Sequence, residues 1–145
     1  MARFEMQMPV DIMTDLTNII NNSDEIFGNM TKAGAEVVYM NIQGSIPPAW
    51  HGSNIMKCLK CTRVYKTPTD DGINCKVGFF GYFFNREGKK TPAPLVANVT
   101  EYGRSHSGMD YPKHPFFRKA FNKSAIEKAM YEAQLTGSGG LLTDE

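Results

Sequence analysis

The chain has 145 residues, of which 16 are Lys or Arg and 15 are Asp or Glu, so its formal net charge is +1. A chain of this length buries roughly two thirds of the surface that its unfolded form exposes, which is enough for one domain with one core. Because the charges nearly cancel, no overall field directs the protein to nucleic acid or to an anionic membrane.

The sequence also contains no signal for a membrane or for secretion. Its longest apolar run, Val77 to Phe84, is far shorter than the roughly 20 residues that a membrane-spanning helix needs. Residues 1–5 lack the apolar core of a signal peptide. We therefore expect no membrane partner, and we expect the protein to stay in the cytoplasm where it is made.

Two helices are predicted in the N-terminal third. After Pro9, apolar residues recur at helical spacing until Asn21-Asn22 ends the pattern, which predicts a short amphipathic helix. Ser23 is then the expected N-cap of a second helix that runs to about Gln43. Gly34 lies inside this helix, where it is either tolerated or lets another element pack closely.

A loop and a hairpin follow. Pro47 and Pro48 end the second helix, and the loop after them carries Trp50, which either plugs the chain's own core or anchors a partner. Residues 58–67 and 73–82 have strand-like composition. The Asp-Gly turn between them predicts an antiparallel hairpin.

The second half of the chain is predicted as an aromatic strand end, two loops and a helix. The aromatic residues of 79–84 are expected to pack in a core or a subunit interface, because no basic residues alternate with them as in a base-stacking platform. Residues 85–94 and 104–113 are predicted as extended or mobile loops. Pro115 suits the first position of a helix that continues to about Ala133, with a possible restart at a capping box that begins at Ser124.

These elements predict an α+β fold, with N-terminal helices and a C-terminal helix packed on a small antiparallel sheet. We expect one domain over residues 1–136. Residues 137–145, which begin with Gly-Ser-Gly-Gly, are expected to form a flexible tail.

The three cysteines suggest a possible metal site. Cys58 and Cys61 form a CxxC, and His51 and Cys75 complete a conceivable four-ligand set for zinc. A zinc knuckle places its paired cysteines around a tight turn, whereas residues 57–66 look like a strand, in which residues three apart point to opposite faces. Free thiols without a metal are therefore the favoured interpretation.

No combination of residues predicts catalysis. The sequence has no phosphate-binding glycine loop, no nucleophile elbow and no HExxH motif. The histidines His51, His106 and His114 lie in predicted loops. Glu101 with His106 or His114 is conceivable as an acid–base pair, but no nucleophile accompanies them. We expect a protein that is not an enzyme and has no cofactor.

The region from Asn98 to Phe121 is the most distinctive part of the chain. It contains Glu101-Tyr102-Gly103, a polar loop and then Pro115-Phe116-Phe117-Arg118-Lys119-Ala120-Phe121. In these motifs and in element order, the chain from the N-terminal helices to about Leu135 resembles the neck or tail-completion proteins of long-tailed bacteriophages, a family that includes the minor tail protein Z of phage lambda. Residues 95–102 suit a helix or a strand. The resemblance implies a helix, with Gly103 as its terminator.

The resemblance implies a structural virion protein that forms a ring, completes the tail and joins it to the head around the DNA channel. The sixfold symmetry of such tails implies a hexameric homo-oligomer. Its expected partners are head-closure, tail-terminator or tail-tube proteins, with DNA passing through the lumen without sequence-specific binding. Two alternatives remain: a tail-terminator or collar ring of a contractile tail or tail-like particle, and a zinc-dependent nucleic-acid-binding module.

A joint between Glu101-Tyr102-Gly103 and Pro115-Phe116-Phe117 is also predicted. Gly103 is expected to supply a left-handed backbone conformation. Phe117 and Phe121 are assigned to the core, and Phe116 to a subunit interface. The candidate subunit or layer interface residues are Trp50, Phe83, Phe84, Arg86, Glu101, Tyr102, Arg104, Tyr111 and Phe116.

Overall fold

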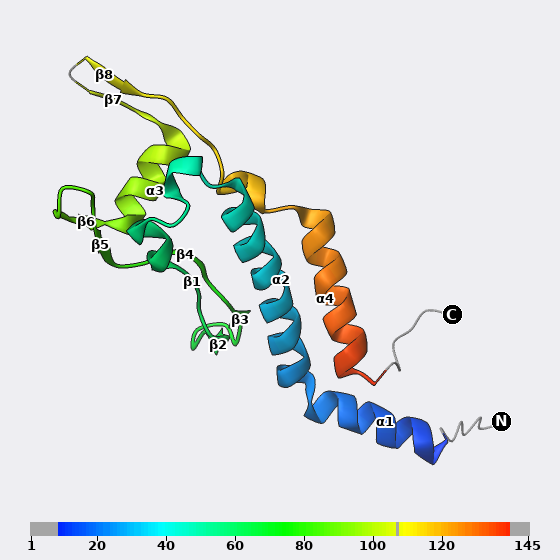
Figure 1. Cartoon of the computed structure of the whole chain (residues 1–145). Coiled ribbons are helices and arrows are strands. Elements are labelled where there is room, and N and C mark those ends of the chain that lie inside the picture. Colours follow the sequence, from blue (N-terminus) through cyan, green and yellow to red (C-terminus); the bar gives the residue numbers. More distant parts are fainter. Residues whose placement is uncertain (1–8, 107, 140–145) are drawn as a thin grey trace.

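The computed structural model describes residues 9–106 and 108–139 of the chain. The long helix α2 (Ser23–Ser45) is the central element (Figure 1). Helix α4 (Lys123–Gly137) lies along one side of α2, and the hairpins and α3 (Ala93–Tyr102) lie on the other side (Figure 1). This arrangement of helices and antiparallel strand pairs confirms the predicted α+β class.

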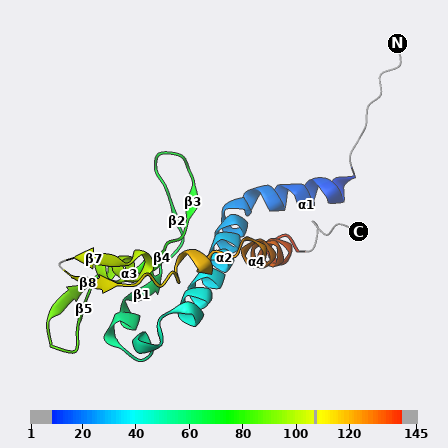
Figure 2. The ribbon, with the colours of Figure 1, turned by 90° about the horizontal axis from the view of Figure 1, so that it is seen from above.

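The N-terminal helices follow the predicted pattern. Helix α1 (Val10–Asn21) begins directly after Pro9, and α2 starts after one intervening residue, Asn22. The N-cap position of α2 is therefore Asn22, and the prediction of Ser23 was wrong by one residue. Both views show that α1 meets the N-terminal end of α2 at a wide angle (Figures 1 and 2).

Two glycines allow α2 and α4 to pack closely. Gly34 is buried, and a Cβ atom added there would lie 3.2 Å from side-chain atoms of both Ile126 and Met130. A Cβ atom on Gly137 would lie 3.1 Å from the side chain of Ile26. Close packing is thus the reason for a glycine inside α2.

The C-terminal helix starts later than predicted. The side chain of Asn122 accepts the backbone N–H of Ala125 at 3.3 Å, so Asn122 is the N-cap and Ser124 lies within α4. The prediction of a helix from Pro115 was wrong. Residues 112–122, which lead into α4, contain a single 3₁₀ turn, Arg118–Ala120.

The end of α4 also differs from the predicted domain boundary. Gly137, the expected first residue of a flexible tail, is the last residue of the helix, and Ser138 after it is buried. The remainder of the predicted tail, residues 140–145, lies outside the described residues.

The predicted hairpin forms, in two sections. Strand β1 (Leu59–Cys61) pairs antiparallel with β4 (Val77–Phe79), and β2 (Tyr65–Lys66) pairs with β3 (Ile73–Asn74). Between the two sections, residues 62–64 and 75–76 interrupt the ladder. The outer section projects to one side of α2 (Figure 2). It is tied back to this helix by Lys66, whose ammonium lies 2.6 Å from the carboxylate of Asp24.

Two further hairpins occupy regions that were predicted as loops. Strand β5 (Tyr82–Phe84) pairs with β6 (Lys90–Pro92), and β7 (Arg104–His106) pairs with β8 (Met109–Tyr111). The predictions of an extended loop at 85–94 and of a mobile loop at 104–113 are therefore corrected for these strands. Together with the interrupted hairpin, the strands of the described part form two-stranded pairs and not one continuous sheet.

Three aromatic rings meet at the centre of the core. Trp50, Phe79 and Phe116 pack edge to face, with ring centroids 5.4–6.1 Å apart. This geometry is favourable for aromatic pairs. Around it pack buried side chains of α2, of the segment between α2 and β1, and of β1 itself: Val38, Ile42, Ile46, Ile55 and Leu59. The core therefore lies between α2 and the base of the hairpins.

Candidate functional site

The carboxylate of Glu101 forms the centre of the predicted joint. Glu101 lies in the last turn of α3 and is 3% exposed. One of its oxygens accepts the backbone N–H groups of Phe116 and Phe117, each at 2.8 Å, and the other accepts that of Arg118 at 3.2 Å. A single side chain thus satisfies three consecutive backbone donors, whereas the side chain of a helix N-cap residue satisfies one.

The charge of Glu101 is stabilised where it lies. Burial alone opposes ionisation, but the backbone N–H groups of Phe117, Phe116 and Arg118, together with the Arg118 guanidinium, outweigh it and hold the pKa of Glu101 below its ordinary value. The Arg118 Nε atom lies 3.0 Å from the carboxylate, and its guanidinium stacks 5.0 Å from the centre of the Tyr102 ring. Arg118 was not among the predicted site residues.

Gly103 adopts a backbone conformation that few residues other than glycine can adopt. Its φ is 77°, positive as predicted, but its ψ is 171°, which places it in the extended glycine-only region and not in the left-handed helical one. A Cβ atom here would lie 2.9 Å from the carbonyl oxygen of Tyr111. A glycine is therefore required at this position for two reasons: its torsion angles, and the close approach of strand β8 at Tyr111.

Phe116 and Phe121 have the reverse of their predicted roles. Phe116 is 0% exposed and stacks against Trp50 and Phe79, so its assignment to a subunit interface was wrong. Phe117, which was also assigned to the core, is half-buried and packs against it. Phe121, which was assigned to the core, is 55% exposed. The reversal follows from the missing helix, because the predicted faces assumed helical spacing from Pro115 onward.

The other predicted interface residues divide into half-buried and exposed groups. Trp50 and Phe83 pack against the core and are half-buried, and Glu101 is enclosed in the joint. The side chains that are exposed are Phe84, Arg86, Tyr102, Arg104 and Tyr111.

Apart from Tyr102, the last residue of α3, these exposed residues lie on the β5–β6 and β7–β8 hairpins. Arg104 and Tyr111 are direct cross-strand partners on the β7–β8 hairpin. Phe84 and Arg86 line one side of a groove of about 560 Å³, and Trp50, His51 and Val96 also contribute to its walls. The β5–β6 hairpin additionally exposes Tyr82, with the Lys90 ammonium over its ring.

A further apolar surface was not predicted as an interface. Helix α1 exposes Ile12, Met13, Leu16 and Ile20, which are 44–70% accessible, and every α1 side chain is at least partly exposed. The periodicity of this helix is visible in the sequence, but the same pattern is typical of a helix that packs on its own core. Only the structure shows that, among the described residues, none packs over this face and buries it.

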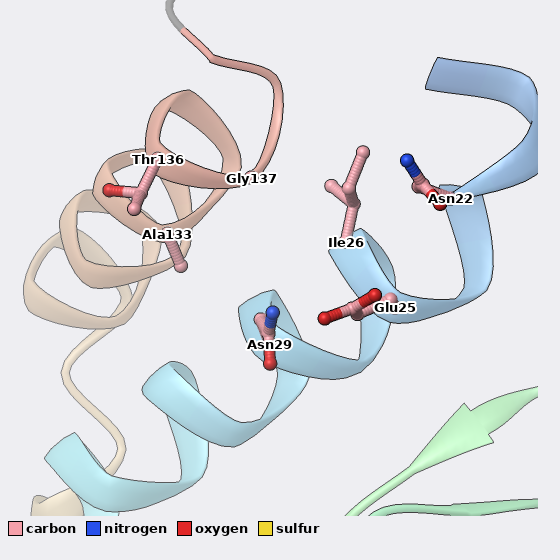
Figure 3. A pocket seen from close by; sticks show the side chains of 7 residues that line it. All are labelled: Asn22, Glu25, Ile26, Asn29, Ala133, Thr136 and Gly137. Carbon is pink, nitrogen blue, oxygen red and sulfur yellow. The ribbon is translucent and has the colours of Figure 1, made fainter. Parts of the chain in front are cut away.

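A hollow of about 550 Å³ lies where α2 begins and α4 ends (Figure 3). Ile26 projects between the two helices beside Gly137, while Glu25 and Asn29 line the α2 wall (Figure 3). The polar side chains here are one carboxylate, two amides and the Thr136 hydroxyl. This hydroxyl donates a hydrogen bond to the Glu132 carbonyl. None of these side chains forms the pair of a nucleophile and a neighbouring base that nucleophilic catalysis uses.

The structure does not assemble the four-ligand set of the zinc alternative. Cys61 and Cys75 come together with their sulfur atoms 3.5 Å apart, but the thiol of Cys58 is buried and points to the Tyr82 carbonyl. Within residues 9–106 and 108–139, no three His, Cys, Asp or Glu side chains are grouped so that they could hold a metal ion. Among the same residues, no helix has the length and apolar character to cross a membrane.

Comparison of the chain with protein-family models, with curated proteins and with solved structures finds no match.

Proposed function

We propose that this chain is a structural ring component of the neck or tail end of a long-tailed bacteriophage. In this role it completes the tail and joins it to the head, and its binding energy serves assembly and not catalysis. Two lines of argument support the proposal. The sequence between Asn98 and Phe121 resembles that family, and the chain exposes apolar surfaces of the kind that subunit contacts cover.

The observation that carries the proposal is a pair of complementary surfaces. The α1 face, made of Ile12, Met13, Leu16 and Ile20, is flanked by Asp11 and Asp15, and α1 contains no basic residue. The β5–β6 face exposes the aromatic rings of Tyr82 and Phe84, which are 63% and 60% accessible, beside Arg86, Lys89 and Lys90. One surface is apolar and acidic, and the other is aromatic and basic.

The two surfaces lie at opposite ends of the molecule (Figure 1). A contact between different faces of successive copies is heterologous, and it generates a closed ring when the rotation between copies closes. We therefore assign a second copy of this chain as the partner of the α1 face. The opposite charges favour this pairing over a contact between two α1 faces, in which four carboxylates would approach one another.

The β7–β8 hairpin supplies a possible contact to the next layer. It projects from the end of α3 and exposes Arg104 and Tyr111. A neighbouring head-closure, tail-terminator or tail-tube protein is the expected partner for such an arm. DNA passes through the lumen of the ring without sequence-specific contacts in this scheme.

An electron-microscopy reconstruction of the particle tests the role. We expect several symmetry-related copies in one ring at the head–tail junction, six if the ring follows the tail symmetry, and the reconstruction also assigns the layer. One asymmetric copy per particle would overturn the ring.

A variant in the α1 face tests the contact. Leu16→Asp should reduce the joining of heads to tails in an assembly assay, because it puts a charge into the apolar surface. Asn18→Asp adds the same charge to an exposed position outside that face and should leave joining intact. If both variants assemble like the wild type, the α1 contact is wrong, although the ring itself can still be seen by reconstruction.

A further inference from the structure

The interruption of the first hairpin brings two thiols together. Cys61 ends β1, and Cys75 lies between β3 and β4 on the returning strand. Their sulfur atoms are 3.5 Å apart, and both residues are half-buried. A disulfide bond requires two sulfur atoms about 2.0 Å apart, so a small side-chain movement is enough to join them.

The surroundings of the two sulfur atoms differ. The Lys32 ammonium, which reaches across from α2, lies 3.5 Å from the Cys61 sulfur. The Cys75 thiol donates to the Thr62 carbonyl at 3.1 Å, a contact that is 3.7 Å long for the Cys61 thiol, and burial together with the neighbouring Cys61 raises the pKa of Cys75. A cation attracts the negative charge that an attacking sulfur carries. This asymmetry identifies Cys61 as the attacking thiol and Cys75 as the one that completes the reaction.

We propose that Cys61 and Cys75 form a reversible dithiol–disulfide modification site whose co-reactant is a small-molecule disulfide. The Cys61 thiolate attacks one sulfur of this disulfide, forms a mixed disulfide and releases one thiolate. Cys75 then loses its proton and attacks the Cys61 sulfur, and a second thiolate leaves. Two protein thiols are oxidised to one disulfide, the small disulfide is reduced to two thiols, and the protons of the cysteines go to the leaving thiolates.

Closure of this bond affects a specific part of the fold. The ladder between β1–β4 and β2–β3 is interrupted at this point, so a covalent link joins the strands where regular pairing is lost. The outer section would then be fixed to the base of the hairpin. This inference does not depend on the proposed role in a phage particle, because it concerns only side chains within one chain.

Cys58 serves as the internal control. Its thiol is buried at the end of a 3₁₀ turn and points to the Tyr82 carbonyl at 3.6 Å, away from the pair. The full-length chain, incubated with oxidised glutathione, should retain one free thiol of three, and peptide mapping should identify a Cys61–Cys75 link. Cys58→Ser should form the same link.

The single variants test the order of the steps. Cys75→Ser should accumulate a glutathione adduct on Cys61, because no second thiol completes the reaction. Lys32→Met should slow adduct formation at Cys61 in this background, whereas Lys57→Met, at an exposed position beside Cys58, should not. Three free thiols after prolonged incubation, a link that includes Cys58, or a link between two chains would overturn the proposal.

Discussion

The carboxylate of Glu101 accepts the backbone N–H of Phe116 at 2.8 Å, although the two residues are separated by the whole β7–β8 hairpin. This bond attaches the end of α3 to the segment that carries the central core ring. Because the same carboxylate also binds the N–H groups of Phe117 and Arg118, a change at position 101 affects the burial of Phe116 as well as the local charge.

Replacement of Glu101 by Gln should destabilise the protein by about 2–3 kcal/mol. Hydrogen bonds to a charged group contribute about 1.5–3 kcal/mol, and the amide NH₂ of Gln cannot accept a backbone N–H. Chemical denaturation measures the free energy of unfolding. Glu127→Gln is the matched control, because Glu127 forms an exposed ion pair with Lys123, and such pairs contribute about 0.3–0.5 kcal/mol. Equal effects of the two variants would show that the hydrogen bonds of Glu101 contribute no more to the free energy of unfolding than an exposed ion pair does.

The contribution of Glu101 should depend on pH. Its folded-state pKa is lowered, whereas the unfolded value is about 4.3, so the folded state holds the proton more weakly. The stabilisation is therefore complete above the unfolded pKa and is lost as the pH falls through the folded one. The difference in unfolding free energy between the wild type and Glu101→Gln should be constant near neutral pH and should shrink in acid. A difference that grows in acid would contradict this sign.

Gly103→Ala should destabilise the fold more than a substitution at an unhindered glycine. A non-glycine residue in this backbone region costs about 1–3 kcal/mol, and the added Cβ would also lie 2.9 Å from the Tyr111 oxygen. Gly88 has a φ of 72° and open space around its built Cβ, so Gly88→Ala carries only the backbone cost of about 1–2 kcal/mol. Thermal unfolding should show a larger loss of stability for Gly103→Ala than for Gly88→Ala. Equal losses would show that β8 moves away from the added methyl group at little cost.

Phe116→Ala and Phe121→Ala should have very different effects on stability. Phe116 is fully buried, and truncation of such a side chain costs about 3–5 kcal/mol. Phe121 is 55% exposed, so Phe121→Ala should change the unfolding free energy by less than about 1 kcal/mol. Comparable losses in the two variants would contradict the burial seen in the fold.

Charge reversal tests the contact proposed between copies. Asp15→Lys on α1 and Lys89→Glu on the β5–β6 hairpin should each weaken the joining of heads to tails, and the double variant should recover part of it, because opposite charges face each other again. Lys128→Glu, at an exposed position of α4, provides the control. A double variant that is weaker than either single one would show that these two residues do not meet.

The two N-terminal helices and the first hairpin were predictable because their signals are local. Apolar spacing after Pro9, the proline pair at 47–48 and the Asp-Gly turn each act within a few residues. The β7–β8 hairpin was missed because all its described side chains are exposed, so its strands show no apolar alternation. Strand β6 was missed because it ends in Pro92 and begins with lysine in a polar stretch.

The site was predictable only in part, since its contacts join distant residues. That Glu101 and the Phe116 segment form one joint followed from the spacing of the motifs and from the resemblance. That Phe116 fills the core was not predicted, because the assignment of the aromatic residues assumed an α-helix from Pro115, and this segment contains only a 3₁₀ turn before α4. The proximity of Cys61 and Cys75 likewise depends on where the hairpin ladder is interrupted.

The β7–β8 arm leaves and re-enters the body of the molecule at a single place. The Thr100 carbonyl accepts the N–H of His114 at 2.7 Å, directly beside the bonds of Glu101 to the Phe116 segment. An arm whose two ends are fixed side by side can gain, lose or exchange residues between them while the rest of the fold stays in place. Sequence changes in this arm can therefore alter its length and surface while the rest of the fold keeps its structure.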